Sequence, residues 1–406
     1  MDGIVQGQWL RRQRLTRGWS VAEMRQQLRV AARAAGDNLP DNECLSGMIR
    51  RWERGDNGMS ERYRLHYCRA FGISHDEFSA ATPAAEPGPA QELSLEQLYD
   101  QLTVLARDYV TGEPLSLFTR MRRVREVLYS ALSRKLWLRD QVDLCFLIGC
   151  LHSLMADAAE ALGGSDLAQE LARAGLGYAL AIDHRPLAAQ LRLNLAITAL
   201  WGGLPLRAAE LAKAGLAYLP GGPNAAQLQL VGARSAARLG DTRTALQLID
   251  DARRTRDVDH ADDLLAIGGE FGFSIASQHY FAGSALVELA GEESVAAGEL
   301  AKAVELYRAG PLPGEHHSAF CELTARVDLA SALTRSGQLD AAVATVDPVL
   351  ACPPSRRVAS LPKRFGRVRA ALAAPGYCGS VQAGEFDQRI ELFCRETAAA
   401  LPASLA

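Results

Sequence analysis

Residues 170–178 read ELARAGLGY, and near copies of this stretch recur at 210–218 (ELAKAGLAY) and at 299–307 (ELAKAVELY). A glycine stands a few residues before each copy and holds the same place in two further stretches: Gly163, Gly203, Gly240, Gly291 and Gly337. Such self-similarity is the sequence signature of an architecture built from repeated structural units. The copies therefore predict the fold of the larger part of the chain.

Each unit is predicted to be a pair of helices joined by a glycine turn. A small residue stands five positions after every one of these glycines: Ala168, Ala208, Ala245, Ala296 and Ala342. A small side chain early in the second helix lets the two helices approach closely. Since one hairpin cannot bury its apolar face alone, neighbouring hairpins are expected to stack into a superhelix.

Successive turns lie 37 to 51 residues apart, and the array resembles a degenerate set of tetratricopeptide repeats, whose ideal period is about 34 residues. The resemblance implies a concave groove lined by the first helix of each unit. Five polar residues fall near that face on the repeat template: Gln190, Gln227, Arg234, Gln278 and Arg326. Amides there could hold an extended peptide backbone, and arginine could hold a carboxylate. The alternative is that each is an ordinary solvated residue.

The first 80 residues predict a bundle of short helices. One basic helix is expected over 8–17, and a second begins at the S-x-x-E capping box formed by Ser20 and Glu23. Further helices are expected over 42–54 and 61–71.

Two segments of this bundle, LRRQRLTRGWS (10–20) and MIRRWERG (48–55), resemble the Cro/lambda-repressor-type helix-turn-helix domain of the Xre family. The resemblance covers residues 8–78 and makes 42–54 the recognition helix, which lies in the major groove of DNA. It places four residues at base edges, namely Ser46, Gly47, Arg50 and Arg51. It places two more, Arg54 and Arg62, near phosphates. The alternative is a small helical interaction domain whose arginines are merely solvated.

The same resemblance implies structural roles for four residues. Arg14 and Glu53 match an internal ion pair that ties the first helix to the recognition helix, while Ile49 and Trp52 belong to the core. The sequence departs from the family in two places. Some fourteen extra residues over 30–43 are expected to lengthen the turn before the recognition helix, and Val21 stands where the family usually has a glutamine that contacts phosphate.

Residues 80–93, AATPAAEPGPAQEL, contain three prolines and separate the two parts of the chain. The predicted organisation is all-α, with a helix-turn-helix bundle followed by a tetratricopeptide-like α-solenoid. Its parts are a DNA-binding domain (1–79), a linker (80–93), atypical helical repeats (94–160), tetratricopeptide-like repeats (161–355) and C-terminal capping helices (356–406).

Composition agrees with a globular helical protein, since 48% of residues are hydrophobic and only 6% are aromatic. Residues 1–80 hold 13 Arg, no Lys and 10 acidic residues, a formal charge of +3, whereas the remainder carries −6. A positively charged N-terminal segment joined to a negatively charged remainder is typical of a separate nucleic-acid-binding module. The eight cysteines lack zinc-type spacing and fit free thiols in a reducing cytosol, and no membrane span is expected.

No phosphate-binding loop, zinc-protease or serine-hydrolase motif occurs in the sequence, so we expect no enzyme, catalytic residue, metal or cofactor. Residues 268–272 (GGEFG) are rich in glycine, but no strand precedes them and they indicate no nucleotide site.

We interpret the chain as a cytoplasmic, DNA-binding transcriptional regulator that binds double-stranded operator DNA as a homodimer. Its repeat domain would mediate dimerisation and sense a peptide, a small molecule or a protein partner. The combination resembles a large bacterial group of such regulators, and the composition, rich in Arg and poor in Lys, would suit an actinobacterium. The alternative is a repeat scaffold for protein partners, with a helix-turn-helix relic that no longer reads DNA.

Overall fold

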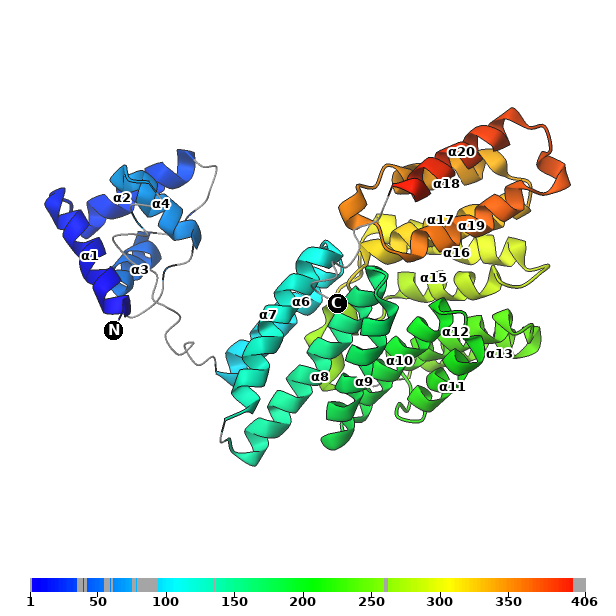
Figure 1. Ribbon diagram of the computed structural model, residues 1–406, viewed down its shortest axis with the longest axis horizontal. Helices are drawn as coiled ribbons and strands as arrows, with labels where there is room; N and C mark the ends of the chain where they lie inside the picture. The colour runs from blue at the N-terminus through cyan, green and yellow to red at the C-terminus, as the bar shows by residue number, and fades with distance from the viewer. Residues whose placement is uncertain are drawn as a thin grey trace. The chain divides into compact units, whose positions relative to one another are not determined.

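The computed structural model describes residues 2–34, 39, 42–54, 59, 61–74, 78, 94–134, 136–258 and 262–396, and the chain divides into two compact units, Met1–Glu92 and Leu93–Ala406 (Figure 1). Within the described ranges every regular element is a helix, so the all-α prediction is confirmed. The predicted linker, 80–93, lies outside the described residues.

Four helices build the described part of the N-terminal unit: α1 (Asp2–Thr16), α2 (Val21–Ala34), α3 (Asn42–Arg54) and α4 (Glu61–Phe71). The predicted capping box begins α2, because the Glu23 backbone N–H donates to Ser20 Oγ (3.2 Å) and the Ser20 N–H donates to Glu23 Oε2 (2.6 Å). Each bond satisfies a backbone donor that the first turn of a helix leaves without an intrahelical partner.

The extra residues before the recognition helix do not all form a turn. Helix α2 continues to Ala34, and it does so because Ala31 and Ala32 are buried in the unit. The part of the insertion that follows Ala34 is described only at Leu39 and from Asn42 onward.

The core of the N-terminal unit is rich in aromatic side chains. The ring of Trp52 packs on Tyr63 and Tyr67, with centroids 4.7 and 5.9 Å apart, and Tyr67 packs in turn on Phe71. Trp52 and Ile49 are both buried, as the resemblance implied. Aromatic side chains bury large areas each, and this helps so small a bundle to hold α3 in place.

Fifteen α-helices and three short 3-10 helices build the described part of the C-terminal unit. In chain order they are α6 (Leu95–Tyr109), α7 (Pro114–Leu132), α8 (Leu138–Ala161), α9 (Ser165–Ala181), α10 (Arg185–Trp201), α11 (Pro205–Leu216), α12 (Pro223–Arg238), α13 (Thr242–Arg256), α14 (Asp263–Ile267), η1 (Gly269–Phe271), α15 (Ile275–Leu286), α16 (Glu293–Ala309), α17 (Ala319–Arg335), α18 (Leu339–Leu350), η2 (Pro354–Arg356), α19 (Ser360–Leu372), η3 (Pro375–Tyr377) and α20 (Val381–Arg395).

The five predicted glycine turns are confirmed. All five glycines have φ between +76° and +86°, a region that residues with a Cβ rarely adopt. The five alanines that follow them are fully buried, so the two helices of each pair are in close contact at that point. The first such pair is α8 and α9, joined at Gly163, and the boundary predicted at residue 161 falls at the end of α8.

The C-terminal helix α19 is joined directly to α8 and α10. The Ala359 backbone N–H, at the start of α19, donates to the Ala161 carbonyl at the end of α8 (2.8 Å). Lys363 Nζ donates to the Trp201 carbonyl at the end of α10 (3.2 Å). The array therefore curls until α19 meets α8 and α10, and the first helices of its pairs surround a common interior.

Helix α8 lies in the core of this curl. It alone among the described helices is long and apolar enough to cross a membrane, and 72% of its most apolar 18-residue window is buried inside the structure. Its apolar residues are accounted for by packing against its neighbours, above all α9 and α7.

Candidate functional site

Helix α3 presents two different faces. At about 100° per residue, the face predicted to meet DNA spans an arc of about 140°. It carries Ser46, Gly47, Arg50, Arg51 and Arg54. The opposite face carries Leu45, Ile49 and Trp52, all buried. The division follows from the sequence, since the apolar side chains recur at helical spacing and leave the arginines outside.

Arg50 and Arg51 are exposed, and no hydrogen bond or ion pair from a described residue reaches either guanidinium. Between them and the start of α3 lies Gly47, where an added Cβ would meet no atom within 4 Å. The surface around Gly47 is therefore open. Beside it lie the guanidinium groups of Arg50 and Arg51, which have no partner among the described residues. Arginine can bridge O6 and N7 of guanine in the major groove, so this surface has the chemistry of base readout.

Ser46 is held more tightly than the sequence suggested. Its Oγ donates to the Asn42 carbonyl (2.8 Å) and accepts from Arg25 NH1 (3.1 Å), while Arg29 Nε donates to Asn42 Oδ1 (3.1 Å). Arg25 and Arg29 belong to α2 and were missed by sequence reasoning. Their spacing of four residues, which puts both on one face of α2, was the available signal.

The predicted ion pair between Arg14 and Glu53 is confirmed. Arg14 Nε donates to Glu53 Oε1 at 2.5 Å and its NH2 donates to Oε2 at 2.7 Å, a bidentate contact between α1 and α3. The hydrogen bond to Glu53 raises the pKa of Arg14 despite its burial. Since the same guanidinium also donates to the Trp19 carbonyl, it fixes the end of α3 against the turn after α1.

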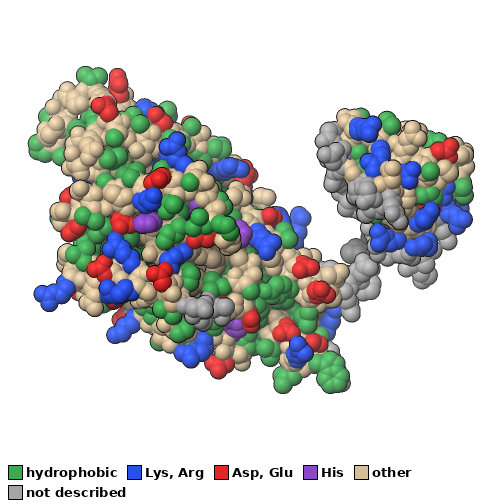
Figure 2. All heavy atoms as spheres, turned by 180° about the vertical axis from the view of Figure 1, so that it is seen from behind, with side chains coloured by type: hydrophobic (Ala, Val, Ile, Leu, Met, Phe, Trp, Pro, Cys, Tyr) green, Lys and Arg blue, Asp and Glu red, His purple; other side chains and the backbone are tan. Residues whose placement is uncertain are grey.

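Arg54 is exposed at the end of α3, and the side chain of Arg62 lies outside the described residues. Basic side chains are spread over the face of the N-terminal unit seen in Figure 2. All of them are arginines, because residues 1–80 contain no lysine.

The interior of the C-terminal unit contains a cavity of about 270 Å³, lined by α6, α8, α10, α12, α15, α17 and α19 and by η1. A smaller cavity of about 80 Å³ shares several lining residues with it. Of the predicted groove residues, Arg234 lines the larger cavity, and Gln190 and Gln227 line the smaller one.

The other two predicted groove residues do not line either of these cavities. Gln278 is buried and its side-chain oxygen accepts from Arg256 (3.2 Å). Arg326 pairs with Glu322 one turn earlier in α17 (2.7 Å). One of the five residues thus lines the larger cavity, two line the smaller one, and the remaining two are engaged in other contacts.

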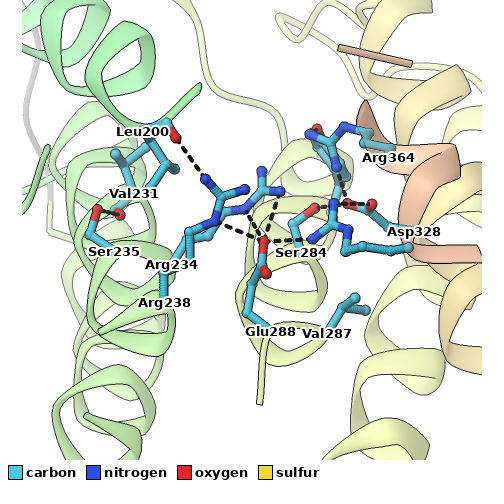
Figure 3. A network of polar contacts seen from close by, with 12 residues as sticks. Leu200, Val231, Arg234, Ser235, Arg238, Ser284, Val287, Glu288, Asp328 and Arg364 are labelled. Atoms are coloured by element: carbon cyan, nitrogen blue, oxygen red, sulfur yellow. Dashed lines mark hydrogen bonds and ion pairs between the residues drawn. The ribbon is translucent and has the colours of Figure 1, made fainter. Parts of the chain in front are cut away.

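A network of arginines and carboxylates (Figure 3) reaches the larger cavity through Arg234 and Arg364, which line it. Its first centre is Glu288, whose Oε1 accepts from Arg234 (3.1 Å), Arg238 (3.1 Å) and Arg367 (2.5 Å). Burial alone would raise the pKa of Glu288. Because three guanidiniums converge on one of its oxygens, the pKa is lowered instead. This carboxylate joins α12 to α19 through the loop after α15.

The second centre of the network is Asp328, which is completely buried on α17. It accepts from Ser284 Oγ (2.5 Å), from Arg367 NH2 (3.0 Å) and from Arg364 NH1. Burial would raise the pKa of this carboxyl, yet Arg364, Arg367 and Arg234 hold it far below the usual range. Asp328 therefore remains ionised in the interior.

Trp201, at the end of α10, lies beside three of these arginines. The guanidinium carbons of Arg234 and Arg364 are each 4.8 Å from its ring centroid, and that of Arg238 is 5.6 Å away. Sequence reasoning found Arg234 and missed the rest of the network, since its members come from helices far apart in the chain.

No protein-family model matches the chain, and no curated protein matches it. Among solved structures, the chain is similar to the crystal structure of Bacillus thuringiensis PlcR in complex with the peptide PapR7 and DNA. The two are 11% identical with a TM-score of 0.32, over 91% of this chain and 100% of that one.

Proposed function

We propose that this protein is a DNA-binding transcriptional regulator that reads operator DNA through α3 and senses an effector in the interior of its C-terminal unit. A single small helical domain has a limited footprint on DNA, and useful affinity calls for two of them on two half-sites. The proposal therefore includes a homodimer.

The observation that carries the proposal is the outer face of α3. Arg50 and Arg51 are exposed and unengaged by described residues, whereas the opposite face is locked by Trp52 in the core and by the bidentate pair of Arg14 and Glu53. A helix that is held rigidly on one side and presents arginine forks on the other is suited to docking in a groove.

The sensing role is supported by the cavity that the first helices of the array surround. A ligand that contacts several of these helices at once can favour one curvature of the array over another, which is the requirement for any conformational switch.

The test is a gel shift of the full chain on its own upstream DNA, at two salt concentrations. We expect sequence-preferring binding that weakens with salt, because phosphate contacts release counterions. Replacing both arginines (Arg50→Ala with Arg51→Ala) is expected to weaken binding by roughly 30-fold or more, as each base contact contributes about 1–3 kcal/mol.

The matched control is Arg11→Ala with Arg12→Ala, which removes the same charge from two exposed side chains of α1. Circular dichroism should show equal helix content in all three proteins. Equal losses in both double variants would mean that net charge alone drives binding, and would contradict the assignment to α3. Absence of any sequence preference in the wild type would favour the scaffold alternative.

A further inference from the structure

The arginine network beside the larger cavity carries more positive than negative charge. It joins four arginines to two carboxylates: Arg234, Arg238, Arg364, Arg367, Glu288 and Asp328. Two positive charges therefore have no carboxylate within the network. Burial, together with repulsion from Arg364 and Arg367, lowers the pKa of Arg234 to about 9. Positive charge that is buried without a counterpart is costly, and such strain is typical of a site that a ligand completes.

The carboxyl groups that line the cavity do not supply the missing negative charge. Asp157, Glu160 and Glu270 line it, yet none forms an ion pair with an arginine of the network among the described residues. Asp157 accepts from Tyr109 OH (2.7 Å) and Glu160 accepts from Ser165 Oγ (3.2 Å), both neutral donors. Burial raises the pKa of all three carboxyl groups and so favours their neutral forms.

Three donor groups on the cavity wall have no acceptor among the described residues. Arg364 Nε is buried and has no hydrogen-bond partner there. Arg234 donates to Glu288 through Nε and NH2, which leaves its NH1 without an acceptor. Tyr280 OH accepts from Arg364 NH2 (2.6 Å), so its own proton remains to be donated. Arg364, Arg234 and Tyr280 belong to α19, α12 and α15, and all three line the cavity. Buried donors are almost always satisfied in native proteins, so these call for an acceptor that enters the cavity.

The rest of the cavity wall is largely aromatic. Trp201, Phe281 and Phe320 line it, and the guanidinium carbons of Arg234 and Arg364 each lie 4.8 Å from the Trp201 ring centroid. The cationic and the aromatic parts of the wall therefore adjoin. A cavity of about 150 Å³ is known to hold one benzene, so about 270 Å³ has room for a body of roughly two fused rings with a short side chain. A peptide of several residues exceeds this space.

Lys363 places a further cation where the cavity reaches the surface. Its side chain lines the cavity, although the residue is exposed, and its Nζ donates to the Trp201 carbonyl (3.2 Å). A cation at this position raises the local concentration of anions.

We propose that the interior cavity binds a small organic anion, with its carboxylate at Arg234, Arg364 and Tyr280 and its apolar body against the aromatic wall. Guanidinium N–H groups are the donors best matched to a carboxylate, and hydrogen bonds between these charged groups are strong. One such ligand supplies both the negative charge that the network lacks and an acceptor for its unused donors. The inference rests on the proposed sensing role and names its chemistry.

The test uses three probes that share an indole body and a two-carbon chain and differ in charge: indole-3-propionate, tryptophol and tryptamine. Each is titrated calorimetrically into the full chain without DNA. Anionic indole-3-propionate is expected to bind at least about tenfold more tightly than neutral tryptophol, because only its carboxylate forms charge-assisted hydrogen bonds. Cationic tryptamine should bind more weakly than either, since it is repelled by the arginines.

Replacing Arg234 tests the assignment directly. Arg234→Gln should weaken the binding of indole-3-propionate by at least about tenfold, because it removes one cationic partner of the carboxylate. In this variant Glu288 keeps Arg238 and Arg367, so α12 and α19 remain joined. The ranking of the three probes on the wild type needs no variant, and it decides the question even if Arg234→Gln does not fold.

A second variant and a matched control complete the experiment. Tyr280→Phe removes only a hydroxyl and should weaken indole-3-propionate by about threefold to tenfold, the effect of one hydrogen bond. Arg253→Gln breaks an ion pair with Glu299 (2.7 Å) that lines neither cavity, and it should leave the affinity unchanged.

Three results would each overturn the proposal: binding of tryptophol or tryptamine as tight as that of indole-3-propionate, unaltered affinity in either cavity variant, or no binding of indole-3-propionate at millimolar concentration. Since DNA is absent, a failed gel shift and a failed titration identify different errors.

Discussion

Replacing Asp328 by asparagine tests whether the arginine network stabilises the C-terminal unit. The change preserves the shape of the side chain and removes its charge. In the wild type this carboxylate is fully buried and accepts from Arg364, Arg367 and Ser284. An amide offers one acceptor oxygen in place of two and directs N–H donors at guanidiniums that are themselves donors.

The expected loss is about 3–5 kcal/mol in the free energy of unfolding, the range for breaking a buried ion pair by removing one partner. The guanidinium of Arg364 is only 2% exposed, so water cannot replace the lost charge. This loss would be a large share of the stability of an ordinary domain, which totals about 5–15 kcal/mol.

The assay is urea unfolding of the full chain, followed by circular dichroism, with Asp387→Asn as the control. Asp387 pairs with Arg369 at 2.7 Å, but both side chains are a third or more exposed, and such surface pairs contribute about 0–1 kcal/mol. If Asp328→Asn costs no more than Asp387→Asn, the network does not hold the array together and the reasoning is wrong.

Lowering the pH should remove the stabilisation that the Asp328 carboxylate provides. The folded-state pKa of Asp328 lies below its unfolded value, so its contribution is present at neutral pH and is lost as the pH falls below about 4. The Asp328→Asn variant should therefore show less acid sensitivity than the wild type between about pH 4 and pH 2, measured by the urea midpoint at each pH.

Two further predictions concern the interior. Gly269→Ala should cost more than about 3 kcal/mol or prevent folding, because its Cβ would collide with the Ala106 carbonyl, whereas Gly291→Ala, with positive φ but no atom within 4 Å, should cost only about 1–2 kcal/mol in the same urea assay. His152 is buried, and burial with the nearby Arg125 lowers its pKa to about 4. The unfolded chain binds that proton first, so wild-type stability should fall as the pH drops from about 6.5 to 4, and His152→Gln should show a flatter profile. An unchanged slope in that variant would exclude His152 as the cause.

The repeat array could be predicted because its signals are local. A glycine that reverses the chain and the alanine five residues after it lie close together in sequence. Gly163 has the positive φ that this spacing implied, and Ala168 is completely buried. The capping box of Ser20 and Glu23 is equally local. The pair of Arg14 and Glu53 is not local, and only the resemblance to a known family made it predictable.

The interior could not be predicted, because its residues meet only after the array has curled. Glu288, Asp328 and Arg364 belong to three separate parts of the chain, and nothing in their neighbourhoods marks them. The longest spacing between turns, from Gly240 to Gly291, should have been the signal for an insertion. That insertion forms α14 and η1, and a strict repeat template has no place for it.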